Sequence, residues 1–280
     1  MFFYYLIYAA PQKAVQKTVA FSRQILYTGR KGGMKMKKER IGFIDDVRGF
    51  ALVAMIFYHA AFNLVQFSRR PLGWLSHIME SDVLEVVRVL FVIIFLLLAG
   101  ICTRLTRRPF VRALKVGIGA LLVTAATWLF VPADKIIFGI LHLMAFSMLF
   151  YAVSAKVLCR IHPLLGSIVC ALLGIFTFSV QEGFLGFGAL RIALPASLYQ
   201  SNIGIIFGFP PHTFQSFDYA PILPYLFFFL CGSFLVRLKL PTWKSHSRFF
   251  AFVGRHSLWV YLLHQPILWG IFLILERCGI

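Results

Sequence analysis

Residues 83–101 read VLEVVRVLFVIIFLLLAGI, and this stretch decides the class of the protein. It is long enough to cross a membrane as one helix, which needs about 20 mostly apolar residues. Its only charged residues are Glu85 and Arg88, which lie one helical turn apart and can pair with each other. The stretch therefore predicts a transmembrane helix whose two charges neutralise each other near its N-terminal end.

The remainder of the 280 residues has the same character. Apolar residues make up 60% of the chain and charged residues 14%, against about 25% charged in an ordinary soluble domain. A soluble fold could not cover so much apolar surface, and the composition also excludes a disordered chain and a secreted disulfide scaffold. We predict an all-α polytopic transmembrane helix bundle of about seven spans, at residues 50–67, 83–101, 113–131, 136–158, 163–180, 220–236 and 249–275.

The distribution of basic residues predicts the orientation of these spans. Lys and Arg outnumber Asp and Glu by 28 to 10, and the excess gathers before the first span and in alternate loops. The largest groups are Lys31, Lys35, Lys37, Lys38 and Arg40, then Arg104, Arg107, Arg108 and Arg112, then Arg237, Lys239, Lys244 and Arg248. Because basic loops stay on the cytoplasmic side, the N-terminus is expected inside and the C-terminus outside. A nucleic-acid partner is not needed to explain the charge.

Two regions stand apart from the spans. Residues 1–39 open with an apolar run too short to cross a membrane, followed by basic residues. We interpret them as a basic N-terminal extension, consistent with a mis-assigned start, ahead of a transmembrane domain at residues 40–280. Residues 181–219 form a long outer segment rich in Gly, Pro and aromatic residues. That composition favours a segment that lies on the outer interface or folds back over the bundle, where it could form a lid or an acceptor site.

A first polar group lies at the cytoplasmic start of the first span. Residues 40–49 read RIGFIDDVRG, which places Asp45 and Arg48 one helical turn apart and follows them with Gly49. Glycine allows another backbone to approach closely. Arg40 and Arg48 could bind phosphate groups at this mouth, and the alternative is a solvated basic anchor.

Histidines form a second set of polar groups, inside the hydrocarbon, where such residues are costly and often functional. His59 lies about 16 Å beyond Arg48 along a helix, and Asn63 follows one turn later. His142 and His264 lie on two other spans at a similar depth, with Gln265 next to His264. Each could instead be a hydrogen-bonded structural histidine. A metal site is not supported, because no His-x3-His pattern or carboxylate lies at that depth.

The order of these motifs resembles a known family. Arg48-x10-His59 is similar to the Arg-x10-His feature of the acyltransferase-3 family of membrane acyltransferases. The wider pattern more closely resembles the bacterial relatives of heparan-alpha-glucosaminide N-acetyltransferase, over roughly residues 40–270. It consists of Arg40-x4-Asp45-x2-Arg48-Gly49, residues 55–59, Phe138-Gly139-Ile140-Leu141-His142, Asp218-Tyr219-Ala220-Pro221 with Pro224, and Gly254-Arg255-His256-Ser257-Leu258 through Tyr261 to His264-Gln265-Pro266. Where animal members have Asn in the first catalytic span, this chain has His59.

The resemblance implies a multi-pass enzyme of the bacterial plasma membrane that is dependent on acyl-CoA. It would move an acetyl group from cytoplasmic acetyl-CoA to a glycan or small-molecule acceptor, an amine or a hydroxyl, on the far side. Membrane lipid surrounds such an enzyme, and whether it forms a homo-oligomer is left open.

On this interpretation the candidate residues take three roles. The guanidinium groups of Arg40, Arg48, Arg104 and Arg255 would bind the nucleotide phosphates of acetyl-CoA, at a mouth that also includes Asp45 and Gly49. His59 would act as general base, with His264 or His142 orienting it or polarising the thioester. Asn63, Asp218 and Gln265 would contact the acceptor.

Two other functions stay open at this point. The histidine cluster could serve a proton-coupled small-molecule transporter as a proton relay, with broken helices at Pro221, Pro224 and Pro266. A non-catalytic membrane scaffold is the other alternative, which the deep polar residues disfavour. Acetyl-CoA binding would separate the enzyme from the transporter.

Overall fold

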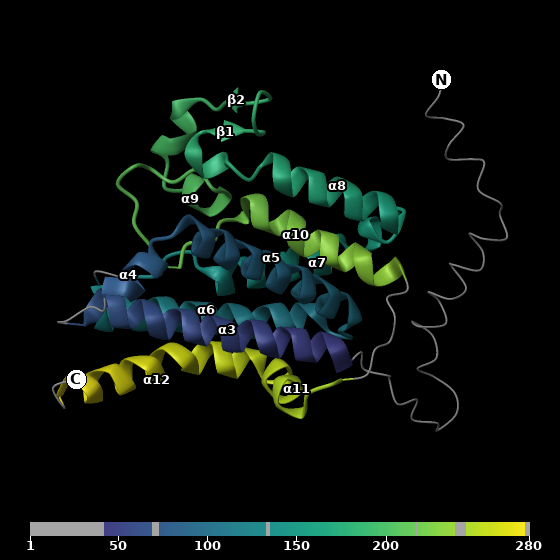
Figure 1. The fold of residues 1–280 in the computed structure, drawn as a ribbon. Helices are drawn as coiled ribbons and strands as arrows, with labels where there is room; N and C mark the ends of the chain where they lie inside the picture. The colour runs from purple at the N-terminus through teal and green to yellow at the C-terminus, as the bar shows by residue number, and fades with distance from the viewer. Residues whose placement is uncertain (1–41, 69–72, 133–134, 217, 239–244, 278–280) are drawn as a thin grey trace, which may run out of the picture. The chain divides into compact units, whose positions relative to one another are not determined.

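The structure is a computed structural model that describes residues 42–68, 73–132, 135–216, 218–238 and 245–277. The extension predicted at residues 1–39 and the predicted phosphate ligand Arg40 lie outside these residues. Figure 1 shows the elements, which are α3 (Gly42–Phe67), α4 (Gly73–Met79), α5 (Asp82–Leu105), α6 (Pro109–Phe130), α7 (Ile140–Leu158), α8 (Pro163–Phe176), η2 (Val180–Glu182), β1 (Phe184–Leu185), β2 (Ile192–Ala193), η3 (Ala196–Gln200), α9 (Gly204–Phe207), α10 (Ile222–Leu235), η4 (Val236–Leu238), α11 (Arg248–Arg255) and α12 (Ser257–Arg277).

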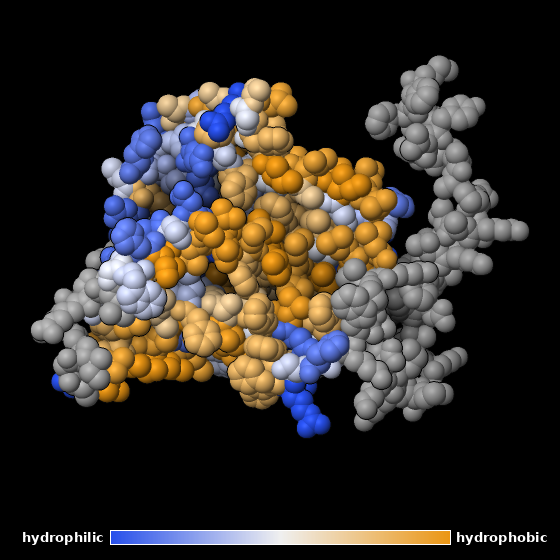
Figure 2. All heavy atoms as spheres, in the orientation of Figure 1, coloured by the Kyte–Doolittle hydropathy of each residue, from blue (hydrophilic) through white to orange (hydrophobic). Residues whose placement is uncertain are grey.

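The predicted all-α polytopic bundle is confirmed in the described residues. Six of their helices are long and apolar enough to cross a membrane, namely α3, α5, α6, α7, α12 and the helix that starts with α8. The flanks of these helices expose large apolar side chains such as Trp128, Leu129 and Val153, as expected for lipid contact. Figure 2 shows this apolar surface over the helices, with hydrophilic residues gathered at the end that carries β1, β2 and α9.

Two predicted spans differ from the observed helices. The segment predicted at residues 249–275 is two helices, α11 and α12, which are separated at His256. The physical reason is the composition of α11, which has an arginine at each end and buries Ala251, Val253 and Gly254. A helix with one apolar side lies along the bundle surface, and its main contact is with α3.

The other difference concerns the segment predicted at residues 220–236. There, α10 and η4 form a shorter apolar helix, at Ile222–Leu238. Its backbone is not helical at Leu223. Ten of the fourteen residues of α10 are buried, because α10 packs between α5 and α8 and also contacts α7.

Glycines let the helices at the centre of the bundle approach closely. A Cβ atom on Gly100 of α5 would overlap the backbone oxygen of Phe229, and one on Gly232 of α10 would overlap the backbone oxygen of Leu97. The two helices therefore contact each other through their backbones, as small residues permit in membrane proteins. Phe229 is fully buried at this contact.

Glycines also allow a close backbone contact between α11 and α3. A Cβ atom on Gly49 would overlap the backbone of Phe250, and one on Gly254 would overlap the backbone oxygen of Asp45. Asp46 strengthens the contact, because its carboxylate accepts hydrogen bonds from the Ser245 hydroxyl and the His246 backbone N–H, both at 2.7 Å. These contacts fix the start of α12 against α3, and α12 packs along both α3 and α6.

The segment between α8 and α10 is hydrogen-bonded to the end of α8 and to the residues just before α7. It contains a two-stranded antiparallel sheet in which Phe184 pairs with Ala193. Tyr219 donates from its hydroxyl to the backbone oxygen of Ile205 at 2.5 Å and forms a β-bridge with Gly139. The bridge holds Asp218 beside the first turn of α7. This end of the bundle lies opposite the end that carries α11 (Figure 1).

Candidate functional site

Arg48 is the centre of a charged cluster between α3, α5 and α12. Its guanidinium lies 3.7 Å from the carboxylate of Asp45, as their spacing predicts, and 3.6 Å from the sulfur of Cys102. It also donates a hydrogen bond to the hydroxyl of Ser257, in the first turn of α12. Arg48 is buried, so its positively charged guanidinium is held in place where the three helices meet. Gly49 lies next to it, at the α11 contact.

A second arginine of this cluster was not among the predicted site residues. Arg112 of α6 donates to the hydroxyl of Thr106 at 3.1 Å and lies close enough to Arg48 and Asp45 for their charges to act on it. The cluster thus holds two guanidinium groups and one carboxylate, which gives it an excess positive charge. In the sequence Arg112 is one of several basic residues between the second and third predicted spans, and nothing local separates it from its neighbours.

Two other predicted phosphate ligands lie elsewhere. Arg104 donates to the Tyr151 hydroxyl at 2.9 Å and to the Cys159 sulfur at 3.0 Å, at the C-terminal end of α7. Arg255 is exposed and donates to the backbone oxygen of Ala251. Residues two apart on a helix point in different directions, which is why Arg104 does not follow Cys102 toward Arg48. The structure therefore brings neither of them to Arg48.

His59 and His264 form a pair deeper in the bundle, between α3 and α12. Their ring centroids are 5.1 Å apart. Gln265 lies beside them, and its side-chain nitrogen is 3.2 Å from Nδ1 of His59. Asn63 donates from its amide to the side-chain oxygen of Gln265 at 3.4 Å. Four of the predicted site residues are thus in one cluster.

Two polar atoms of this cluster have no partner. Asn63 and His264 are 3% and 6% exposed, and Oδ1 of Asn63 and Nε2 of His264 accept or donate no hydrogen bond in the described part of the chain. Such atoms are uncommon in buried positions, and a bound ligand or water is the usual partner for them. Two of them in one cluster indicate a place where a polar group of a ligand can enter.

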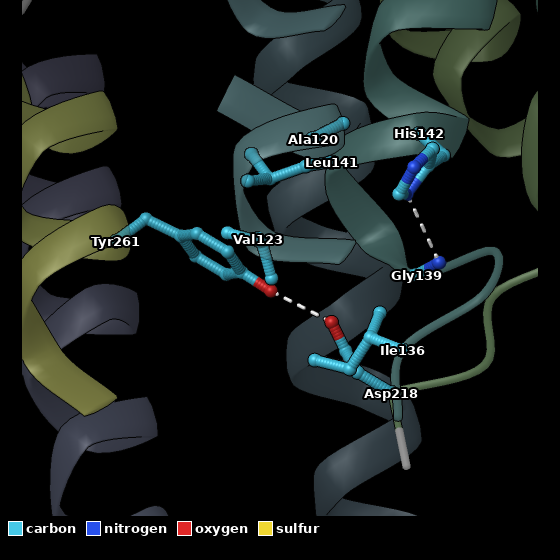
Figure 3. Close-up of a pocket in the computed structure, with 8 residues that line it drawn as sticks. All are labelled: Ala120, Val123, Ile136, Gly139, Leu141, His142, Asp218 and Tyr261. Carbon is cyan, nitrogen blue, oxygen red and sulfur yellow. Dashed lines mark hydrogen bonds between the residues drawn. The ribbon is translucent and has the colours of Figure 1, made fainter. Parts of the chain in front are cut away.

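A third polar group lies toward the end that carries the β-hairpin. The carboxylate of Asp218 accepts hydrogen bonds from the Tyr261 hydroxyl at 2.7 Å and from the backbone N–H of Ile140 at 3.4 Å. Burial raises the pKa of the Asp218 carboxyl, and the two hydrogen bonds oppose the rise. Figure 3 shows Tyr261 and Asp218 pointing toward each other across a small pocket lined by Ala120, Val123, Ile136, Gly139, Leu141, His142, Asp218 and Tyr261.

His142 belongs to this pocket and not to the histidine pair. Its Nδ1 accepts from the backbone N–H of Gly139 at 3.3 Å, and its Nε2 lies 3.3 Å from the Thr124 hydroxyl. The similar depth predicted for the three histidines therefore does not bring them together. His142 points away from α12 because it caps the first turn of α7 (Figure 3).

Tyr261 connects the pocket with the pair and was not among the predicted site residues. Its ring centroid is 5.3 Å from that of His264, and its hydroxyl reaches Asp218. Ser257, Tyr261, His264 and Gln265 follow the helical spacing of one face, which α12 turns toward α3 and α6. That spacing was the sequence signal that could have identified Tyr261.

One more ion pair of the described residues lies outside these groups. Glu85 and Arg88 pair with each other at 2.8 Å between Oε2 and Nε, which confirms the pairing predicted from their spacing. Within the described residues no group of three or more His, Cys, Asp or Glu side chains could hold a metal ion.

Comparison with known proteins gives one match. Residues 40–266 match the family described as heparan-alpha-glucosaminide N-acetyltransferase, catalytic. No curated protein and no solved structure matches the chain. The match covers well over half of the sequence and includes both the charged cluster around Arg48 and the histidine pair.

Proposed function

Because this multi-pass membrane protein belongs to the heparan-alpha-glucosaminide N-acetyltransferase family, we propose that it moves an acetyl group across the bacterial plasma membrane. The donor is acetyl-CoA in the cytoplasm, and the acceptor is a sugar or related molecule with an amine or hydroxyl on the other side. The observation that carries the proposal is the order of polar groups along α3 and α12. Along α12 they run from Ser257 at the cationic cluster, through Tyr261 at the Asp218 carboxylate, to His264 of the histidine pair.

The cluster around Arg48 fits the phosphates of the donor. Arg48 and Arg112 supply two guanidinium groups, and Asp45 neutralises only one of them. Guanidinium groups bind phosphate oxygens through paired N–H donors. The closeness of α11, which Gly49 and Gly254 permit, keeps the start of α12 and its Ser257 at this cluster.

The pantetheine arm would then run between α3 and α12 to the histidine pair. His59 lies eleven residues beyond Arg48, which is about 16 Å along α3. His264 lies seven residues beyond Ser257, which is about 10 Å along α12. An extended arm covers distances of this size. The thioester carbonyl would therefore lie beside His59 and His264, where Asn63 and His264 have polar atoms without partners.

The acceptor would enter from the opposite end, past Asp218. Its carboxylate is held by Tyr261 and by the first turn of α7, and it lines the small pocket with His142. A carboxylate in that position can accept hydrogen bonds from a sugar hydroxyl or amine. Asn63 and Gln265 would complete the acceptor contacts close to the histidines.

The test is direct binding and turnover with the full chain in lipid nanodiscs. Calorimetry should detect binding of acetyl-CoA and weaker binding of CoA that lacks the 3′-phosphate. In the absence of an acceptor, slow hydrolysis of the acetyl-CoA thioester should follow. Failure to bind or hydrolyse acetyl-CoA would overturn the proposal.

The alternative is a proton-coupled transporter, which the chain of groups from His264 through Tyr261 to Asp218 would also suit. In proteoliposomes, proton uptake driven by a small-molecule gradient, without acetyl-CoA binding, would favour the transporter.

A further inference from the structure

The hydrogen bonds of His264 determine which of its nitrogens carries the proton. Its Nδ1 lies 2.5 Å from the backbone oxygen of Tyr261. A carbonyl oxygen only accepts, so Nδ1 must be the N–H donor. In a neutral imidazole the other nitrogen then has a free lone pair. That nitrogen, Nε2, is the buried atom without a partner.

The hydrogen bonds around His59 place its proton on the other ring nitrogen, Nε2. Asn63 donates from its amide nitrogen to the side-chain oxygen of Gln265. The amide nitrogen of Gln265 therefore faces His59, 3.2 Å from Nδ1. An amide nitrogen only donates, so Nδ1 of His59 accepts and its Nε2 carries the hydrogen. Two neighbouring imidazoles are thus held in different tautomers by different partners.

From this difference we propose that the two histidines divide the chemistry: His264 is the general base through Nε2, and His59 donates a hydrogen bond through Nε2–H to the thioester carbonyl. The division rests on the proposed acetyl transfer and assigns roles within that site. It differs from the sequence-based expectation, in which His59 is the base. The fixed Nδ1–H donor of His264 keeps its basic nitrogen in one place, as an orienting partner does for other catalytic histidines.

The transfer step balances with these two residues alone. The acceptor oxygen or nitrogen attacks the carbonyl carbon of acetyl-CoA while its proton moves to Nε2 of His264. The new bond to carbon forms, and the negative charge that develops on the carbonyl oxygen is stabilised by Nε2–H of His59. The carbon–sulfur bond then breaks, its electron pair stays on the sulfur, and the proton passes from His264 to that sulfur to give CoA.

The first test observes the tautomers directly. The full chain, labelled with ¹⁵N-histidine in nanodiscs, is studied by NMR at about pH 8, where ordinary imidazoles are neutral. Difference spectra against His264→Asn and His59→Gln assign the two residues. We expect a proton on Nδ1 of His264 and on Nε2 of His59. The opposite tautomer at either residue would overturn the division of roles.

The second test uses amides that copy one ring nitrogen. The amide N–H of Gln can replace Nε2–H as a donor, but an amide cannot take up a proton. His59→Gln should therefore keep turnover within about tenfold, while His59→Ala should lose about 10²-fold or more, as for removal of one oxyanion donor. His264→Gln and His264→Asn should both lose about 10²–10⁴-fold.

Acetyl-CoA affinity, measured in the same proteins, keeps the two proposals distinguishable. His162→Gln, at an exposed histidine before α8, is the matched control and should behave as the wild type. Substantial turnover in both His264 variants, with acetyl-CoA bound normally, would overturn the role of His264 alone. A wild-type protein that binds no acetyl-CoA would instead overturn the proposed function, and the tautomers would still be read by NMR.

Discussion

The hydroxyl of Tyr261 lies 2.7 Å from the carboxylate of Asp218, which joins the second turn of α12 to the segment just before α10. The backbone N–H of Ile140 donates to the same carboxylate oxygen, so three parts of the chain meet at one atom. The ring of Tyr261 also lies beside that of His264, tilted by 56°. A change at the outer pocket can therefore reach the histidine pair through a single side chain.

Replacing Tyr261 with Phe should weaken the acceptor end of the site and spare the donor end. The substitution keeps the ring beside His264 and removes only the hydroxyl that holds Asp218. Because a hydrogen bond to a charged group contributes about 1.5–3 kcal/mol, we expect the KM for the acceptor to rise by about ten- to a hundredfold. Steady-state kinetics and calorimetry check this. A loss of acetyl-CoA affinity instead would place Tyr261 at the donor site.

Replacing Asp218 with Asn should change how stability depends on pH. Burial raises the pKa of Asp218, so the folded protein holds this proton more tightly than the unfolded chain. The stability that Asp218 contributes is present in full below its ordinary pKa of 3.8 and is lost as the pH rises through the folded value. The melting temperature of the wild type, compared with that of Asp218→Asn at the same pH, should therefore fall as the pH rises from about 3.5. A constant difference between the two proteins would contradict the raised pKa.

Replacing Arg48 or Arg112 with Ala should weaken acetyl-CoA binding. Each removes a guanidinium from the cationic cluster, and charge-assisted contacts of about 1.5–3 kcal/mol correspond to about ten- to a hundredfold in affinity. Arg48→Lys should recover only part of the loss, because the paired donors are absent. Arg104→Ala is the matched control, since Arg104 contacts the end of α7. Calorimetry measures these affinities. An equal loss of acetyl-CoA affinity in Arg104→Ala and Arg112→Ala would contradict the assignment of Arg112, and not Arg104, to the donor site.

The predicted orientation can be checked with single cysteines. In a Cys159→Ser background, a cysteine at Thr213 should react with an impermeant maleimide in intact cells, because Thr213 is exposed in the segment expected outside. A cysteine at Arg108, exposed in a basic loop, should react only after permeabilisation. The reverse pattern would invert the direction of transfer.

The contact between α3 and α11 should tolerate no side chain at Gly254. A Cβ atom there would overlap the backbone oxygen of Asp45, whereas one at Gly270 of α12 would meet no atom within 4 Å. We expect Gly254→Ala to destabilise the protein by about 1–3 kcal/mol, as overpacking does. Gly270→Ala should be neutral or stabilising, since Ala is the better helix former. Thermal melts of both variants check this, and similar melting temperatures would show that the helices separate easily.

Local properties of the sequence determined the helical class and several features of the site. The hydropathy of residues 83–101 and of the other apolar segments predicted the bundle, because a membrane requires long apolar helices whatever their packing. Spacing along one helix predicted the Glu85–Arg88 and Asp45–Arg48 pairs, both of which the structure contains. Counting residues along α3 places His59 about 16 Å beyond Arg48, whereas the count for His264 from Gly254 crosses the break between α11 and α12.

Tertiary structure decided which of these groups meet. Arg104 and Arg112 are equivalent basic residues in the sequence, yet only Arg112 lies near Arg48, because helix rotation and packing direct Arg104 to α7. His142 is predicted at the depth of the other histidines but caps the first turn of α7, away from them. Depth along a membrane is a local property of one helix, whereas contact depends on how helices rotate and approach. The backbone contacts at Gly49, Gly100, Gly232 and Gly254 fix that approach, and no single segment contains both partners of any of them.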